Sequence, residues 1–236
     1  MAINDGVSFT WIGHGTWLVR TSGGKSILID PWVMNNPVAP ESLKKIDDLD
    51  IMVITHGHFD HIFDAVEIGK ATNPKVIAQF ETAAWLEKKG VVGATGLAFN
   101  KGGMVEIDGV QFTMTHADHS CGISDGDQIV YGGEAVGYVI RFENGFTIYF
   151  SGDTGIFGDM ALIGEMYKPE VAFLPVGGHY IMEPMQAAKA AQLIGVKTVV
   201  PMHFGTFPIL DGTPAQVQQI VGPGIRILDI KPGDTI

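Results

Sequence analysis

Four residues that can bind metal ions or transfer protons stand close together in the segment HGHFDH, directly after an apolar run of the chain. They are His56, His58, Asp60 and His61. In an extended segment, residues two apart point the same way, so His56 and His58 can reach one point and the next pair a second point nearby. Imidazole and carboxylate groups bind zinc, manganese, iron or nickel. The spacing therefore predicts two neighbouring divalent ions, which can hold a shared hydroxide at neutral pH.

Two metal ions need further ligands, and the chain offers them directly after three later apolar runs. The candidates are His119 or His116 in MTHADHSCG, Asp153 in YFSGDTG and His203 in VPMHFGTFP. Loops at the carboxyl ends of strands gather ligands in layered α/β folds. Asp153 alone fits the N-cap of a helix near residue 159 or an Asx-turn equally well. Its place in a series of strand-end ligands favours metal binding.

Catalytic roles are predicted for three residues. Asp60 is expected to bind metal and to accept a proton from the nucleophile. His14 and His179 lie in Gly-rich segments at strand ends and are candidates for contact with a developing oxyanion or for protonation of the leaving group. The alternative for both is a hydrogen-bonded loop histidine. The polar, Gly-rich segment 120–134 is expected to be a loop that borders the substrate entrance.

The elements that must position these residues are short strands followed by strands mixed with helices. Strands are predicted at 7–11, 16–20, 26–31, 51–55, 75–78, 109–114, 137–142, 146–150, 171–175, 198–201 and 225–228. Helices are predicted at 62–71, 80–89, 159–167, 184–195 and 214–221. Pro184 and Pro214 suit the first helical turn, and Thr213 suits an N-cap. This order indicates an α/β layered domain with helices over a two-sheet core, and residues 1–236 are predicted to form a single domain.

Charge and composition restrict the partners. The net charge of −11 disfavours nucleic acid and anionic membranes, which favours a small-molecule substrate. No apolar stretch is long enough to span a membrane, and the N-terminus lacks the features of a signal peptide. Cys121 is the single cysteine, so no internal disulfide can form and a cytoplasmic location is expected. The stretch SGGKS is similar to a phosphate loop, but Val19 stands where the first glycine is required, which favours a hairpin turn.

The H-x-H-x-D-H string resembles the signature of the metallo-β-lactamase superfamily. The stretches WIGHGTWLV, ILIDPW, ADHSCG, LPVGGHYIMEPMQAA and VPMHFGTFP are similar to a narrower group, the metal-dependent hydrolases related to L-ascorbate-6-phosphate lactonase. The resemblance extends over residues 11–208. It implies a four-layer αββα sandwich with a dinuclear metal site at one edge, between the sheets.

The resemblance also implies a ligand set. The implied ligands are His56, His58 and His119 for the first ion, Asp60, His61 and His203 for the second ion, and Asp153 as the bridge. His119 is preferred to His116 because the family pattern places its histidine directly before a serine, as in His119-Ser120. Two divalent ions are expected, with zinc first and manganese, nickel or iron as alternatives. Relatives often assemble, so a homo-oligomer is also considered.

Three functions are considered. A lactonase-like hydrolase of small-molecule esters comes first, and a phosphodiesterase or nuclease comes second. An iron redox protein or a non-catalytic metal-binding module comes third. Class B β-lactamases often place a cysteine among the second-site ligands, but Cys121 lies outside that pattern, and MTHADHS differs from the T-P-G-H-T segment of the glyoxalase II type.

Overall fold

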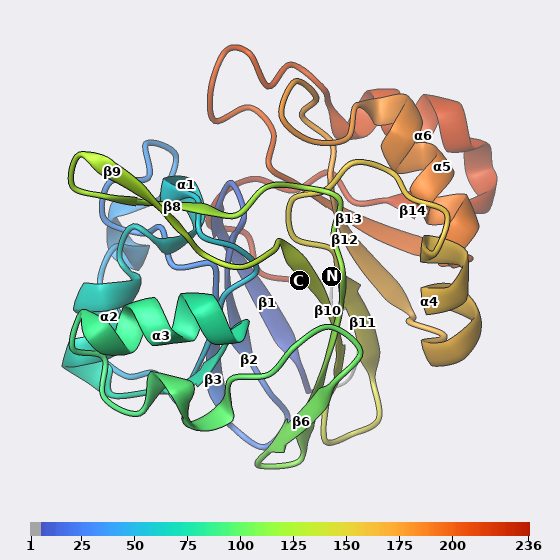
Figure 1. Cartoon of the computed structure of the whole chain (residues 1–236). Helices are drawn as coiled ribbons and strands as arrows, with labels where there is room; N and C mark the ends of the chain where they lie inside the picture. The colour runs from blue at the N-terminus through green and yellow to red at the C-terminus, as the bar shows by residue number, and fades with distance from the viewer. Residues whose placement is uncertain (1–5) are drawn as a thin grey trace.

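A computed structural model describes residues 6–236 and shows two β-sheets stacked face to face (Figure 1). The first sheet has the strand order β1-β2-β3-β4-β5. Its strands are β1 (Ser8–Gly13), β2 (Thr16–Arg20), β3 (Ser26–Ile29), β4 (Ile51–Val53) and β5 (Lys75–Ile77). Strands β3, β4 and β5 run parallel, so their carboxyl ends meet at one edge of the sheet.

The second sheet has the strand order β14-β13-β12-β11-β10-β7-β6. Its strands are β6 (Met104–Ile107), β7 (Val110–His116), β10 (Val136–Arg141), β11 (Thr147–Phe150), β12 (Val171–Pro175), β13 (Thr198–Met202) and β14 (Arg226–Ile227). Strands β11 to β14 run parallel, while β6, β7, β10 and β11 pair antiparallel. A separate hairpin consists of β8 (Gly122–Asp125) and β9 (Gln128–Tyr131).

Helices cover the outer face of each sheet and complete four layers (Figure 1). The helices beside the first sheet are α1 (Phe59–Ile62), α2 (Ala65–Thr72) and α3 (Phe80–Lys88). Those beside the second sheet are α4 (Met160–Tyr167), α5 (Pro184–Ile194) and α6 (Pro214–Val221). Short 3₁₀ turns lie at η1 (Glu41–Leu43), η2 (Ala94–Leu97) and η3 (Gly222–Gly224). The predicted αββα sandwich is confirmed.

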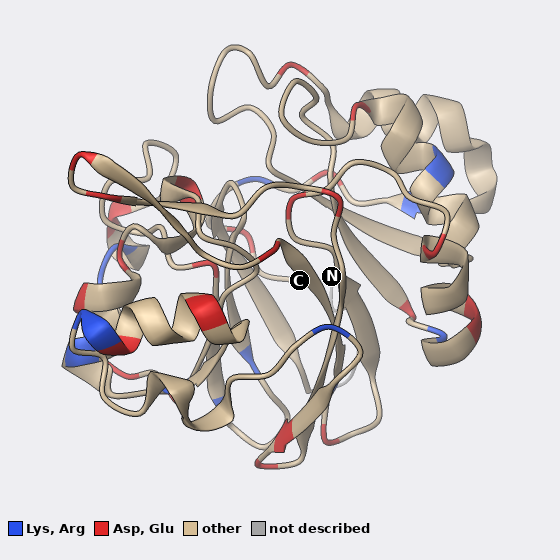
Figure 2. Cartoon of the chain, viewed as in Figure 1, with Lys and Arg blue, Asp and Glu red and all other residues tan. Residues whose placement is uncertain are grey.

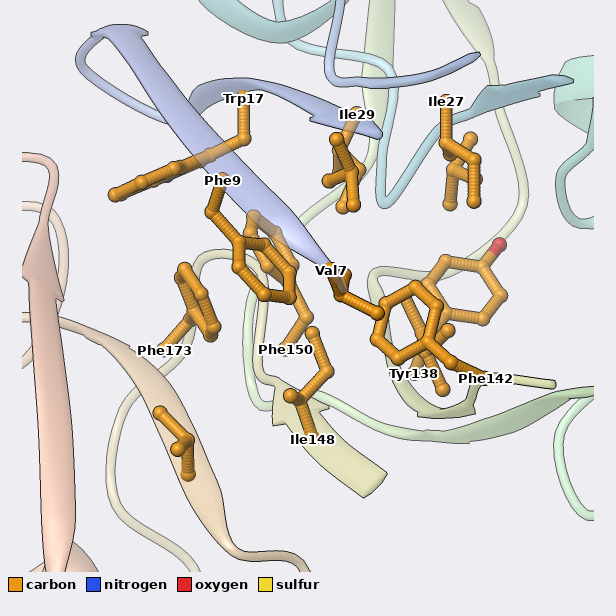
Figure 3. Close-up of a cluster of buried hydrophobic side chains, with 14 of the residues drawn as sticks. Val7, Phe9, Trp17, Ile27, Ile29, Tyr138, Phe142, Ile148, Phe150 and Phe173 are labelled. Atoms are coloured by element: carbon orange, nitrogen blue, oxygen red, sulfur yellow. The ribbon is translucent and has the colours of Figure 1, made fainter. Parts of the chain in front are cut away.

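The central core lies between the two sheets and is rich in aromatic rings (Figure 3). The Phe173 ring centroid lies 5.1 Å from that of Phe9 and 4.9 Å from that of Trp17. Neighbouring side chains of a strand point to opposite faces of its sheet, so β4 contributes both to the core between the sheets and to the core between the first sheet and its helices. Ile51 joins the central core, whereas Met52 packs in a second cluster beneath α2 and α3.

Several details differ from the predicted elements. The segment 120–134 is mainly the β8–β9 hairpin rather than a loop. The run Ile129-Val130-Tyr131 favours an extended strand, and Gly126, where φ is +66°, allows the tight turn that joins β8 to β9. Strand β6 was not predicted. The helix predicted at 62–71 is divided into α1 and α2, and the division falls at Asp64, whose carboxylate accepts backbone N–H groups from Val33 and Met34.

The helix starts predicted from proline and threonine residues are confirmed. Pro184 and Pro214 occupy the first turns of α5 and α6, and the Thr213 hydroxyl accepts the backbone N–H of Gln216 in a capping box. Over residues 6–236, every helix is too short to cross a bilayer, and α5 has only 11 residues.

Candidate metal centre

Three imidazole nitrogens converge beyond the carboxyl end of β4. The chain stays extended through His58, which is the N-cap residue of α1 with φ −68° and ψ 150°. His58 Nδ1 lies 3.0 Å from His56 Nε2 and 3.2 Å from His119 Nε2. His119 comes from the segment between β7 and β8, so the second sheet supplies the third nitrogen. The three nitrogens form a group of the size and chemistry that a single cation requires.

A second group lies beside the first and joins α1 to both sheets. Its members are His14, Asp60, His61 and His203. Asp60 and His61 already lie within α1, and the His61 ring lies beside that of His56 with a centroid distance of 4.1 Å, so the two groups adjoin. His203 follows β13, has φ +55°, and donates its backbone N–H to the carbonyl oxygen of His14 at 3.1 Å. Its Nε2 lies 3.6 Å from Asp60 Oδ2.

Asp153 lies between the two groups. It is buried and follows the carboxyl end of β11. Its Oδ2 lies 3.0 Å from His203 Nε2 and 3.3 Å from His61 Nε2. The same oxygen lies 3.8 Å from His119 Nε2 and 3.9 Å from His56 Nε2. A single carboxylate oxygen thus faces nitrogens of both groups, which is the arrangement that a ligand bridging two cations requires.

The donor atoms fit a pair of cations. Oδ1 of Asp153 is buried, and within residues 6–236 it makes no hydrogen bond. Nε2 of His61 and Nε2 of His203 are also buried, and their contacts to Asp153 Oδ2 are ion pairs without hydrogen-bond alignment. Buried polar atoms without partners are rare in folded proteins and need an explanation. Imidazole nitrogens and carboxylate oxygens around one small volume suit zinc and other first-row divalent metals.

The charges of the carboxylates are set by their neighbours. Burial opposes ionisation of Asp153, but the positive charges of His203 and His61 outweigh it and hold the pKa of Asp153 well below its usual value. Burial also opposes ionisation of Asp60, yet the hydrogen bond from His14 keeps the Asp60 pKa low. Both carboxylates are therefore anionic at neutral pH, which is the form that binds a cation.

The charges of the histidines differ between the two groups. Burial lowers the pKa of His56, which keeps this imidazole neutral and its nitrogen available. Burial also lowers the pKa of His203, but the Asp153 carboxylate outweighs it and raises the value to about 9. A cation that binds at His203 would displace the proton that Asp153 stabilises.

Asp30 supports the centre and was not predicted as a functional residue. It is fully buried after β3 and accepts hydrogen bonds from His61 Nδ1 at 2.7 Å, the Thr55 N–H at 2.8 Å and the Thr55 hydroxyl at 2.7 Å. Since Nδ1 of His61 donates to Asp30, Nε2 is the nitrogen that would bind a cation, which would displace the proton that Asp153 stabilises there. An acidic residue at the end of the apolar run SILI was the available signal.

His14 contacts Asp60 from behind the pocket. It is fully buried, with Nε2 2.9 Å from Asp60 Oδ2 and Nδ1 2.9 Å from the Thr206 hydroxyl. Burial lowers the pKa of His14 to about 3, so the ring is neutral. Nε2–H then donates to Asp60, and Nδ1 accepts the Thr206 hydroxyl proton. The contact with Thr206 was also not predicted.

Two other predicted candidates lie outside these groups. His179 is exposed in the segment between β12 and α5, and its ring packs against Tyr180 with a centroid distance of 4.4 Å. Its catalytic role stays a prediction. His116 is exposed at the end of β7, where Nδ1 lies 3.2 Å from Lys101 Nζ. The structure therefore brings His119, and not His116, to the other nitrogens.

A pocket of about 520 Å³ opens over the centre. His58, Asp60, His119, Asp153 and His203 form its floor. This volume lies within the range of small-molecule sites. The hairpin contributes one wall, as the prediction for the segment 120–134 expected.

Residues 25–204 match the family model described as "Beta-lactamase superfamily domain". The matched region includes strands of both sheets and every member of the two histidine groups except His14. The chain therefore belongs to the β-lactamase superfamily, and its αββα layers and histidine-rich edge are those of the metallo-β-lactamase fold.

Similar proteins specify the class further. A protein of Koribacter versatilis named "UPF0173 metal-dependent hydrolase" is 52% identical over 98% of both chains. A protein of the same name from Roseiflexus castenholzii is 47% identical, over 99% of this chain and 98% of its own. The structure of Igni18, described as a novel metallo hydrolase from Ignicoccus hospitalis, has a TM-score of 0.84 and 36% identity, and the match covers 98% of this chain and 97% of that one. These similarities place the chain among the metal-dependent hydrolases of the superfamily.

Proposed function

We propose that this protein hydrolyses a small-molecule ester, with lactones as the leading class, by means of two divalent ions held at the candidate metal centre. The observation that carries the proposal is the position of Asp153, whose single oxygen faces nitrogens of both groups at 3.0 to 3.9 Å. In this proposal His56, His58 and His119 hold one ion, Asp60, His61 and His203 hold the other, and Asp153 bridges them. Zinc fits the nitrogen-rich donor set, with manganese, nickel and iron as alternatives.

When bound, the ions supply Lewis acidity, which lowers the pKa of a water molecule and polarises a carbonyl oxygen. The protein residues supply orientation and charge. Asp60 is exposed to the pocket through 14% of its side chain and is the carboxylate that we propose accepts a proton from the nucleophile. His14 acts as a positioning residue, because its hydrogen bond holds Oδ2 of Asp60, the oxygen that also lies 3.6 Å from His203 Nε2. The orientation of His61 depends on Asp30 in the same way.

The wider proposal is a single hydrolase domain in the cytoplasm that acts without nucleic acid or membrane partners and that forms homo-oligomers if it assembles. The net charge of −11 supports the absence of a nucleic-acid partner, because it repels phosphate backbones. The free, buried thiol of Cys121 is compatible with a reducing compartment.

The test combines metal analysis with a substrate panel. The purified protein is loaded with zinc, and bound metal is measured alongside hydrolysis of a δ-lactone, bis-p-nitrophenyl phosphate and nitrocefin. The proposal expects about two ions per chain and preferential lactone turnover. Turnover of the phosphodiester alone would replace it with the phosphodiesterase alternative. Full activity of a metal-free protein would refute the metal-dependent mechanism.

A further inference from the structure

The walls of the pocket differ in chemistry from its floor. Part of the lining, called the apolar wall below, consists of Phe59, Tyr180, Phe207 and Ile209. Phe59, Tyr180 and Ile209 are exposed through 50%, 60% and 45% of their surfaces. Large apolar side chains in contact with solvent beside a reactive centre offer area that a ligand can cover.

Neighbouring rings pack against the apolar wall and support it. The buried ring of Trp32 supports it, with centroid distances of 5.8 Å to Phe59 and 6.0 Å to Phe207. Phe207 also packs edge-on against His14 at 5.7 Å. Trp32 therefore supports Phe59 and Phe207, and Phe207 also contacts His14, which holds Asp60. A substrate group that lies on these two rings is thereby placed close to the candidate metal centre.

The remaining lining outside the metal centre presents hydroxyl groups. They belong to Ser120 and Ser124. Ser120 Oγ lies 3.2 Å from His58 Nε2, whereas Ser124 projects from β8. Across residues 6–236, the pocket lining contains no lysine or arginine. Its charged groups, the carboxylates of Asp60 and Asp153 and the His203 imidazole, all lie at the floor, where bound divalent ions would add positive charge.

Five of the 15 basic residues lie at the opposite edge of the sheets, where Lys25 and Lys75 form ion pairs with acidic neighbours. Parallel strands of both sheets begin there, and a lysine or arginine stands at or just before the start of many of them. These residues are Lys25, Lys75, Lys168, Lys197 and Arg226. The candidate metal centre lies at the carboxyl edge, where Figure 2 shows acidic positions on α1 and at the tip of the hairpin. The fold therefore separates its fixed cations from the pocket.

We propose that the substrate is an uncharged ester or lactone whose apolar chain or ring lies against Phe59, Tyr180 and Ile209, and that substrates with an additional carboxylate or phosphate are discriminated against. This inference rests on the proposed hydrolase function and specifies its substrate class. A remote anion would lose its hydration against apolar rings and hydroxyl groups without gaining a cationic partner, which is costly. An apolar group in the same place gains free energy for each methylene that it buries.

The first experiment compares p-nitrophenyl butyrate with mono-p-nitrophenyl succinate, in which a carboxylate replaces the terminal methyl group. The zinc-loaded protein is expected to show a kcat/KM at least about tenfold higher for the butyrate. Lengthening the acyl chain from acetate to hexanoate should raise kcat/KM by up to about fourfold per methylene. Equal or faster hydrolysis of the succinate, or no dependence on chain length, would overturn the inference.

A binding measurement keeps the inference testable if neither ester is hydrolysed. N-methylhexanamide and its ω-carboxylate analogue, both resistant to hydrolysis, are titrated into the zinc-loaded protein and followed by ligand-detected NMR. The uncharged amide should bind at least about tenfold more tightly. Absent ester and lactone turnover with this preference intact would refute the proposed hydrolysis alone, whereas equal or tighter binding of the anion would refute the substrate class alone.

Variants of the pocket lining test which residues favour uncharged over anionic compounds. Ile209→Ala should lower kcat/KM for the hexanoate, and binding of the hexanamide, about tenfold. Ile129→Ala is the matched control, because Ile129 is 80% exposed on β9 and does not line the pocket. Ser124→Arg should raise activity and binding for the anionic compounds, whereas the long, uncharged Ser124→Gln should not. Identical behaviour of the arginine and glutamine variants would contradict the electrostatic explanation.

Discussion

Replacement of Asp30 by asparagine should weaken one metal position without touching a predicted ligand. Asp30 is fully buried and accepts three hydrogen bonds, two of them at Oδ2, from His61 and from the Thr55 hydroxyl. Asparagine has only one acceptor oxygen. If its oxygen takes the Oδ2 position, the amide N–H₂ faces the Thr55 backbone N–H. If it takes the Oδ1 position, the amide faces His61 Nδ1. At least one buried donor therefore loses its partner in either orientation.

The expected loss of stability follows from the number of donors left without a partner. A buried donor left without a partner costs about 1–3 kcal/mol, so the free energy of unfolding of the metal-free Asp30→Asn variant should fall by that amount. His61 can relieve the conflict by moving its proton to Nε2, but that nitrogen then cannot bind metal. Loss of such a supporting group typically reduces metal affinity about 10- to 100-fold. We therefore expect one ion to be held normally and the second to be weakened.

Equilibrium dialysis against zinc buffered by a competing chelator, followed by metal analysis, measures both affinities. Urea unfolding of the metal-free protein measures stability. Asp50→Asn is the matched control, because Asp50 also accepts several hydrogen bonds in the first sheet but lies at the start of β4, away from the candidate metal centre. If Asp30→Asn binds both ions with wild-type affinity, or if the control loses metal equally, the reasoning about His61 is wrong.

Three further predictions concern the metal ligands, a helix contact and pH. His58→Ala should abolish hydrolysis while leaving the circular dichroism spectrum largely unchanged; retained turnover would contradict its assigned role. Gly164→Ala should lower the free energy of unfolding by about 3 kcal/mol, because a Cβ there overlaps a backbone carbonyl of α5, whereas Gly158→Ala has nothing within 4 Å and should be neutral. The hydrogen bond from the Ser26 N–H holds the pKa of Asp50 below its usual value. The ionised Asp50 carboxylate therefore stabilises the fold, by about 1 kcal/mol after solvent screening. This stabilisation is fully present at pH values above the pKa that Asp50 has in the unfolded chain. The stability difference between wild type and Asp50→Asn should therefore shrink as pH falls below about 4 in urea titrations, and a pH-independent difference would refute this account.

The sequence alone determined the local chemistry of this protein. The H-x-H-x-D-H string, the strand-end residues Asp153 and His203, and the proline and threonine helix starts depend on neighbours in the chain, so spacing and residue type were enough to predict them. His119 was preferred to His116 because of the family resemblance. Membership in the superfamily followed from the same stretches, and the αββα layers followed from that resemblance.

Tertiary structure decided which distant groups meet. Asp30 reaches His61 only because β3 and β4 lie parallel and adjacent, and Thr206 reaches His14 only because the two sheets converge at one edge. The position of the chain after β7 brings His119 to His58, in agreement with the choice that the resemblance had favoured. The pocket wall at Phe59, Phe207 and Ile209 arises from segments far apart in sequence, and no local pattern encodes that packing. Through-space contacts depend on the positions of whole strands and helices, so periodicity and spacing cannot specify them.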